Sequence, residues 1–146
     1  MQGGRLFLYN GAMKSILFLL TPKIQTSFLY DDDSLRQALE KMEYHRFALI
    51  PVITHDGKYV RSLAEGDILY AMKHHNMSFD EMHHYPLEIA KSNRDIKPVK
   101  VEATIDDLKD LIVSQNYVPV IDDKGIYIGI ITRKAVMNEL FHPSED

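Results

Sequence analysis

The 146-residue chain contains no cysteine. This absence excludes disulfides, thiolate nucleophiles and cysteine-based zinc sites, and it fits a reducing cytoplasm, where we expect the protein to act. A long apolar run is also missing, because the apolar run near the start, Ile16–Leu20, is followed at once by Thr21-Pro22-Lys23. Such a run is too short for a membrane span or a signal-peptide core, so no membrane association is expected.

Basic charge is not in excess either. Seventeen Lys and Arg residues against 21 Asp and Glu residues leave a net charge of −4. Because nucleic-acid-binding surfaces are usually basic, no nucleic-acid partner is expected. Hydrophobic residues make up 45% of the chain, which is enough to build the core of one compact domain or of two half-domains that share it.

Catalytic signatures are absent as well. The chain has no Ser/His/Asp array, glycine-rich phosphate loop or HExxH motif, so we expect no enzyme, no catalytic residue and no cofactor. His74-His75 and His83-His84 bracket a stretch that contains two carboxylates, and these side chains can bind a divalent transition metal. Adjacent histidines on a helix point in different directions, however, so a solvated linker is favoured over a metal site here.

What the chain does have is an internal repeat. Residues 51–59 read PVITHDGKY, and residues 119–127, 68 positions later, read PVIDDKGIY. Upstream, residues 34–42 match residues 104–112 at an offset of 70, and the match also continues downstream. Self-similarity at a nearly fixed period indicates one supersecondary unit that is used twice.

The first copy is predicted to fold as strand–helix–strand–strand–helix. Ser34 and Gln37 have the spacing of a capping box, and the apolar residues that follow recur at helical spacing. The continuous apolar run 47–53 is typical of a buried strand, and Asp56-Gly57 predicts a hairpin turn. The expected elements are a strand at 27–30, a helix after Ser34, strands at 47–53 and 58–63, and a helix at 65–75.

The second copy repeats this order. Its expected elements are a strand at 99–101, a helix capped by Thr104, paired strands at 117–121 and 126–131, and a last helix that Thr132 opens. A three-stranded sheet with two helices leaves one apolar face uncovered, and two copies can bury these faces against each other. The sequence therefore predicts an α/β (α+β) fold of two pseudo-symmetric β-α-β-β-α repeats packed through their sheets, with a cleft between the halves.

This order resembles the cystathionine-β-synthase (CBS) domain, two of which form a Bateman module. The resemblance rests on the Pro-Val pairs and on GIITRKAVM at the last strand–helix junction, and it covers about residues 20–142. It implies an N-terminal extension (1–19), a first repeat (20–76), a linker (77–95), a second repeat (96–142) and a tail (143–146). Residues 1–12 have no counterpart in the other copy, and Met13 is an alternative start, in which case residues 1–12 are not native.

The resemblance also implies a function. CBS pairs are similar in binding adenosine-containing ligands such as AMP, ATP, S-adenosylmethionine or cyclic di-AMP, and they act as sensors rather than catalysts. We therefore expect a regulatory adenine-nucleotide-binding module that forms a homodimer and acts through a partner protein whose identity the sequence does not give. The alternatives are a structural or interaction module that has lost its ligand, and a histidine-based metal-binding protein.

Each copy departs from the family pattern at its strand–helix junction. The first copy has Arg61 and Ala64 where Gly and Thr or Ser are usual, but it keeps Asp67, whose family role is to hold the ribose hydroxyls. The second copy keeps the glycine and Thr132 but has Ala135 where Asp is usual. The two clefts are therefore predicted to be unequal, with the phosphate end of the stronger one at the second junction.

A closer resemblance is to the small stand-alone CBS-pair proteins of Firmicutes, some of which bind cyclic di-AMP. It rests on the Thr-Arg-Lys junction, on residues 114–117 and on residues 22–25. Together the two resemblances and the strand–helix junctions predict nucleotide contacts from Lys23, Gln25, Phe47, Ala48, Asp67, Tyr117, Thr132, Arg133 and Lys134, and no metal ligands.

Most of these residues also have a plain structural interpretation. Thr132 is a sufficient helix N-cap, and Asp67 is favourable in a first helical turn because it interacts with the helix dipole. Phe47 and Tyr117 are equally consistent with core side chains, and the basic pair that follows Thr132 is consistent with a solvated face. Lys23 is otherwise an ordinary loop cation.

Overall fold

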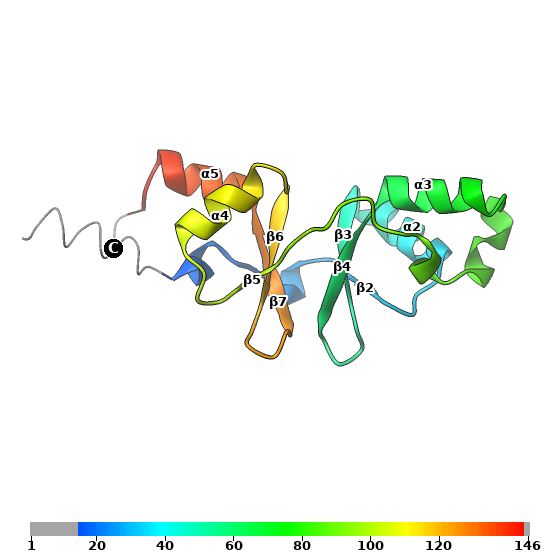
Figure 1. The fold of residues 1–146 in the computed structure, drawn as a ribbon, viewed down its shortest axis with the longest axis horizontal. Helices are drawn as coiled ribbons and strands as arrows, with labels where there is room; N and C mark the ends of the chain where they lie inside the picture. Colours follow the sequence, from blue (N-terminus) through cyan, green and yellow to red (C-terminus); the bar gives the residue numbers. More distant parts are fainter. Residues whose placement is uncertain (1–14, 145–146) are drawn as a thin grey trace, which may run out of the picture.

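A computed structural model describes residues 15–144, and the alternative start at Met13 lies outside this range. The protein has two β-sheets, and each sheet has its own pair of helices (Figure 1). Along the long axis the order is helix pair, sheet, sheet, helix pair, so the sheets lie next to each other in the middle of the molecule. This arrangement confirms the predicted pairing of two α/β repeats through their sheets.

The first repeat contains the five predicted elements. They are β2 (Leu29–Tyr30), α2 (Leu35–His45), β3 (Leu49–Ile53), β4 (Tyr59–Ala64) and α3 (Glu65–His74). The sheet order is β2-β3-β4, with β2 parallel and β4 antiparallel to β3. The capping box before α2 is confirmed: the Gln37 amide donates to Ser34 Oγ over 3.1 Å, and the Ser34 amide donates to Gln37 Oε1 over 2.8 Å.

The second repeat contains the same elements and one more strand. They are β5 (Val99–Lys100), α4 (Ile105–Ile112), β6 (Tyr117–Ile121), β7 (Tyr127–Thr132) and α5 (Arg133–Phe141). The short strand β1 (Thr21–Pro22) adds to the outer edge of β7, which gives the order β1-β7-β6-β5. Thr104 and Thr132 cap α4 and α5 as predicted, each accepting a backbone N–H at its hydroxyl.

The strand register confirms the duplication residue by residue. In β3–β4, Leu49 pairs with Ala64 and Pro51 with Ser62, and every pair in that hairpin recurs 68 positions later in β6–β7. Both hairpins shift register after the second valine, at Val52/Ile53 and Val120/Ile121. The repeat is therefore a true structural equivalence, and differences between the two copies are meaningful.

The segment before the first repeat belongs to the second half of the molecule, which the sequence did not indicate. Ile16, in the short 3-10 helix η1 (Ile16–Leu19), is fully buried in the second core. Gly129 permits the approach of β1, because a Cβ atom at this position would lie 2.2 Å from the Thr21 carbonyl oxygen. A second 3-10 helix, η2 (Lys23–Gln25), then leads towards the first sheet.

The segment between the repeats is packed rather than simply solvated, which corrects the expectation for the histidine stretch. It forms η3 (Phe79–His84) and η4 (Leu87–Ile89), and it contributes the buried residues Met77, Met82, Leu87 and Ala90 to the first core. The histidines themselves are exposed. Within residues 15–144, no three side chains of the metal-binding types come together.

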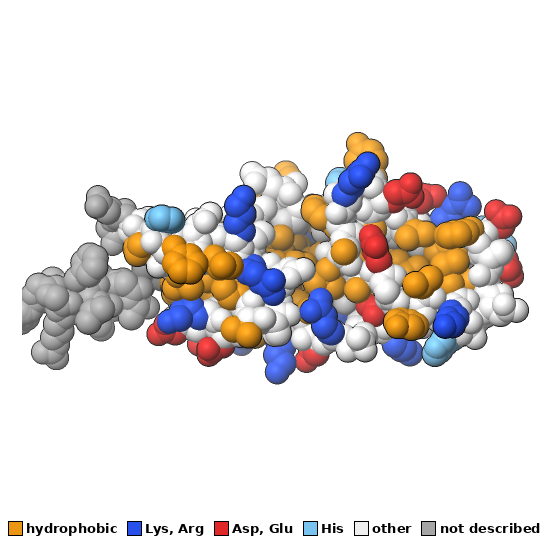
Figure 2. Space-filling view, turned by 90° about the horizontal axis from the view of Figure 1, so that it is seen from above, with side chains coloured by type: hydrophobic (Ala, Val, Ile, Leu, Met, Phe, Trp, Pro, Cys, Tyr) orange, Lys and Arg blue, Asp and Glu red, His pale blue; other side chains and the backbone are white. Residues whose placement is uncertain are grey.

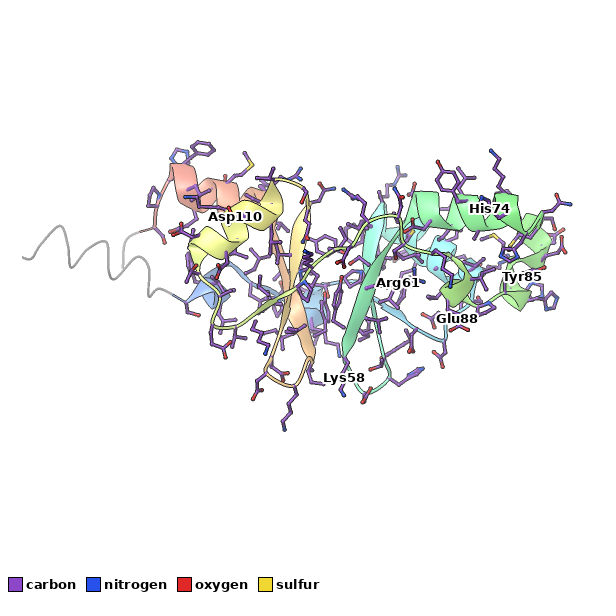
Figure 3. The ribbon with its side chains drawn as sticks, in the orientation of Figure 1. Lys58, Arg61, His74, Tyr85, Glu88 and Asp110 are labelled. Carbon is purple, nitrogen blue, oxygen red and sulfur yellow. The ribbon has the colours of Figure 1, made fainter. Side chains whose placement is uncertain are left out.

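The two sheets are joined at their hairpin tips and by a polar seam. At the tips, the Tyr59 amide donates to the Gly125 carbonyl over 3.1 Å and the Tyr127 amide donates to the Gly57 carbonyl over 2.9 Å. Figure 3 marks this junction at Lys58, which forms an isolated antiparallel bridge with Ile126. Deeper in, the buried Ser62 and Tyr117 hydroxyls are hydrogen-bonded at 2.6 Å. Among the described residues, no helix is long and apolar enough to cross a bilayer.

Candidate functional site

A hollow between the halves lies beside the junction of β7 and α5, and we call it the Thr132 cleft. Its volume is about 300 Å³. One wall comes from the segment before β2 and from the start of β3, and the other comes from β6 and β7. The lining residues are Thr21, Gln25, Thr26, Ser27, Phe47, Leu49, Pro51, Asn116, Tyr117, Ile130 and Thr132.

One end of the Thr132 cleft is polar and faces a helix N-terminus. Thr132 is the N-cap of the nine-residue helix α5, and its Oγ1 accepts the Ala135 amide over 3.1 Å. An adjoining surface hollow shares Asn116 and Thr132 with the cleft and continues over Arg133 and Lys134. A helix start with two cations and a hydroxyl favours an anionic group such as phosphate.

The two cations of this end are held differently. The Arg133 Nε donates to the Ile112 carbonyl oxygen over 2.8 Å, so the side chain is anchored to the end of α4. Its backbone amide donates to the Asn116 carbonyl, also over 2.8 Å. Lys134 is exposed and lines the adjoining hollow. Arg133 therefore has a structural role in addition to any contact with a ligand. Lys134 is the better residue for testing the effect of a single positive charge on ligand binding.

Aromatic side chains also line the Thr132 cleft, one on each wall. Phe47 is 45% exposed, and its ring is stacked against His45 with the ring centres 5.8 Å apart, just before β3 begins at Leu49. Tyr117 lines the opposite wall and is only 7% exposed. Burial raises the pKa of the Tyr117 phenol well above its usual value. A flat, uncharged ring such as a nucleobase suits the space beside these aromatic side chains.

Of three further predicted residues, one lines the Thr132 cleft and two lie outside its lining. Gln25 lines the Thr132 cleft as predicted. Lys23 is not among the lining residues, and its Nζ instead lies 5.1 Å from the centre of the Phe28 ring. Ala48 is exposed, and its carbonyl oxygen accepts the Glu65 amide. Contacts from Lys23 and Ala48 therefore remain predictions that need movement or an extended ligand.

The pseudo-equivalent hollow at the first junction, the Asp67 cleft, is much smaller. Its volume is about 110 Å³, and its lining residues are Leu49, Ser62, Ala64, Gly66, Asp67, Tyr70, Asn93 and Arg94. Asp67 is 4% exposed, and both of its carboxylate oxygens are already engaged. One accepts the Ala64 amide over 2.8 Å and the other accepts the Asn93 amide over 3.1 Å. Asp67 is thus separated from Thr132, in the other cleft, and its ribose role remains a prediction.

Arg61 reaches from β4 to the linker beside the Asp67 cleft (Figure 3). One guanidinium nitrogen donates to the Ala90 carbonyl over 2.5 Å and to Ser92 Oγ over 2.8 Å, and the other donates to the Leu87 carbonyl over 3.1 Å. Burial lowers the pKa of Arg61, and the nearby Asp67 and Glu88 counteract part of that effect.

Sequence reasoning missed much of the lining of the Thr132 cleft. Thr21 and Thr26 come from a segment with no repeat partner in the predicted elements, and Ser27 begins the predicted strand at 27–30. Only the fold brings these three residues to the second junction. Asn116 could have been found, because it directly precedes the predicted strand that begins at Tyr117. Arg61 was visible as a departure from the family pattern, but its contacts were not.

Comparison with known proteins identifies the family. The family model of the CBS domain matches residues 21–74 and 88–142, and the chain therefore belongs to the CBS domain family, with two copies in tandem. An uncharacterised protein of Methanocaldococcus jannaschii, MJ1426, is 26% identical over 141 residues, with 77% of this chain and 84% of that protein covered.

Solved structures of CBS-pair proteins have the same fold. CbpB in complex with cyclic di-AMP superposes with a TM-score of 0.82 at 24% identity, covering 92% of this chain and 89% of that chain. CbpB from Streptococcus agalactiae superposes with a TM-score of 0.73 at 27% identity, covering 85% and 80%. The predicted likeness to the CBS-pair proteins of Firmicutes is thereby confirmed.

Proposed function

We propose that this protein is a non-catalytic sensor that binds an adenine nucleotide in the Thr132 cleft and signals to a partner protein in the cytoplasm. The observation that supports the proposal most is that an aromatic-lined cleft adjoins a hollow over a cationic helix start, with Asn116 and Thr132 lining both. The base would lie between Phe47 and Tyr117, and the phosphate would lie at Thr132 and Lys134. The complex of the structural neighbour CbpB with cyclic di-AMP is consistent with this class of ligand.

The test is calorimetric titration of the intact chain with AMP, ATP and cyclic di-AMP in turn. Lys134→Gln should lower the affinity for the nucleotide that binds by about ten- to a hundredfold, because one charge-assisted hydrogen bond, worth about 1.5–3 kcal/mol, is lost. Lys124→Gln makes the same charge change at an exposed hairpin turn away from the cleft and should leave affinity unchanged. Lys134 is preferred to Arg133 because replacing Arg133 would also remove the bond to Ile112.

The pattern across ligands separates the modes of binding. Cyclic di-AMP has no free 3′-hydroxyl, so an Asp67→Asn variant should matter only for a ligand that is held by its ribose in the Asp67 cleft. If none of the three nucleotides binds at millimolar concentration, the interaction-module alternative replaces the sensor proposal. If Lys134→Gln and Lys124→Gln bind equally well, the phosphate is not held at α5.

We also propose that the sensor is a homodimer. In Figure 1 both helix pairs, at opposite ends of the long axis, lie towards the upper edge of the molecule, and Figure 2, seen from above, shows hydrophobic side chains gathered towards both ends of that face. The exposed large hydrophobic residues of these helices include Leu69 of α3 and Phe141 of α5, at 64% and 71% exposure. Apolar surface of this kind favours association. Sedimentation equilibrium should give twice the chain mass, and a monomer at the concentrations of the titration would contradict the dimer.

A further inference from the structure

We propose that Arg61 holds the linker across the Asp67 cleft and keeps that cleft closed to ligands, so that each chain has one nucleotide site. The inference rests on the proposed function for what the open cleft would bind. It follows from comparing two equivalent positions, since Arg61 pairs with Val52 and Gly129 pairs with Val120 in the same register. We call residues 87–93 of the linker the strap.

The edge beyond Gly129 is filled by backbone. Strand β1 pairs with β7 there, with Pro22 opposite Gly129. A side chain at this position would collide with the Thr21 carbonyl, so the strand can approach only because the residue is glycine. The segment that follows β1 then turns away and lines the Thr132 cleft, which stays open.

The edge beyond Arg61 is filled by a side chain instead. The first sheet stops at β4, and no fourth strand pairs with it in the described part of the chain. The Arg61 guanidinium donates hydrogen bonds to two strap carbonyls and to Ser92 Oγ. The Ser92 hydroxyl in turn donates to the Ser62 carbonyl over 3.0 Å. The strap is therefore attached to β4 through the Arg61 and Ser92 side chains. At the equivalent edge of the second sheet, β1 is attached to β7 through backbone pairing instead.

This attachment places the strap against Asp67, the residue that would bind a ribose in the Asp67 cleft. The Asn93 amide occupies one Asp67 oxygen, and Asn93 and Arg94 line what is left of the hollow. That space, about 110 Å³, is roughly a third of the Thr132 cleft, at about 300 Å³. A ribose diol could reach Asp67 only if the strap moved away. The departure of Arg61 from the family pattern is therefore a device that closes one site.

The main test is the Arg61→Gly variant, which places at the first junction the residue that the second junction has. Calorimetry with AMP should give one site per chain for the unmodified protein and a second binding event for Arg61→Gly. Ser92→Ala removes two of the strap's attachments without changing a strand, so it provides the same test if Arg61→Gly fails to fold. Arg36→Ala, an exposed arginine on α2, is the matched control and should keep one site.

A second readout does not depend on any ligand. Hydrogen exchange at the Asn93 amide should be about tenfold faster or more in Arg61→Gly and Ser92→Ala, because the strap opens more often. The Lys97 amide, held by Gln115 outside the strap, should not change. A single site in all variants, or unchanged exchange at Asn93, would overturn the closure. If the unmodified protein binds no nucleotide, the proposed function fails, and the exchange result alone decides whether Arg61 closes the cleft.

Discussion

At the scale of single residues, the tyrosines between the sheets connect the two halves. Ser62 lines the Asp67 cleft and Tyr117 lines the Thr132 cleft, so their 2.6 Å hydrogen bond belongs to the walls of both clefts. Tyr59 also contacts Ser62, and its ring is stacked with that of Tyr127, with the centres 6.5 Å apart. A ligand that moves one wall must therefore disturb a polar network that both halves share.

These tyrosines make the free energy of unfolding depend on pH in the alkaline range. Burial raises the pKa of Tyr59 and of Tyr127 to about 12, above the usual value of about 10. Because the folded state keeps the phenol protons longer, their contribution to stability is complete below about pH 10 and is lost as the pH rises towards about 12. The free energy of unfolding, measured in urea from about pH 8 to 11.5, should fall less steeply in Tyr127→Phe.

Tyr44→Phe is the control for that experiment. Tyr44 is 83% exposed, so Tyr44→Phe removes a phenol from the surface rather than from between the sheets, and the variant should follow the unmodified protein. Equal pH slopes for Tyr127→Phe and the unmodified protein would show that the buried phenol does not couple folding to ionisation.

At the scale of elements, the sequence predicted what depends on local signals. Ser34, Thr104 and Thr132 mark helix starts because a capping hydroxyl acts within three residues of itself. The apolar runs and their glycine-containing turns predicted the hairpins. Because the sequence is repeated, each copy supported the assignment in the other. Strand β1 (Thr21–Pro22) was missed because, within residues 15–144, it has no equivalent strand in the first sheet and forms only where β7 offers it an edge.

The β1–β7 contact can be tested through its glycine. Gly129→Ala should destabilise the protein by about 1–3 kcal/mol, because the new Cβ would meet the Thr21 carbonyl and force β1 away from the sheet. Gly66→Ala is the matched substitution: nothing lies within 4 Å of its Cβ position in α3, so it should be neutral or stabilise the protein by up to about 1 kcal/mol. Chemical denaturation measures both, and a neutral Gly129→Ala would contradict the close approach.

At the scale of the whole molecule, the sequence predicted only some of the residues that line the candidate site. The structure brings Gln25, Phe47, Tyr117 and Thr132 together in one cleft, with Arg133 and Lys134 at its mouth, but it leaves Lys23 and Ala48 outside the lining and Asp67 in the other cleft. Local patterns do not specify how two halves face each other. The closed Asp67 cleft depends on the path of the linker, and no motif in the sequence describes that path.

The central claim is that an adenine nucleotide lies in the Thr132 cleft. Amide chemical shifts of the isotope-labelled protein, recorded during titration with AMP and separately with cyclic di-AMP, test it most directly. The account predicts saturable changes at residues 21–27, 47–51, 116–117 and 130–134, with much smaller changes at residues 64–67 and 93–94. Changes centred on residues 64–67 instead, or no changes at millimolar nucleotide, would contradict it.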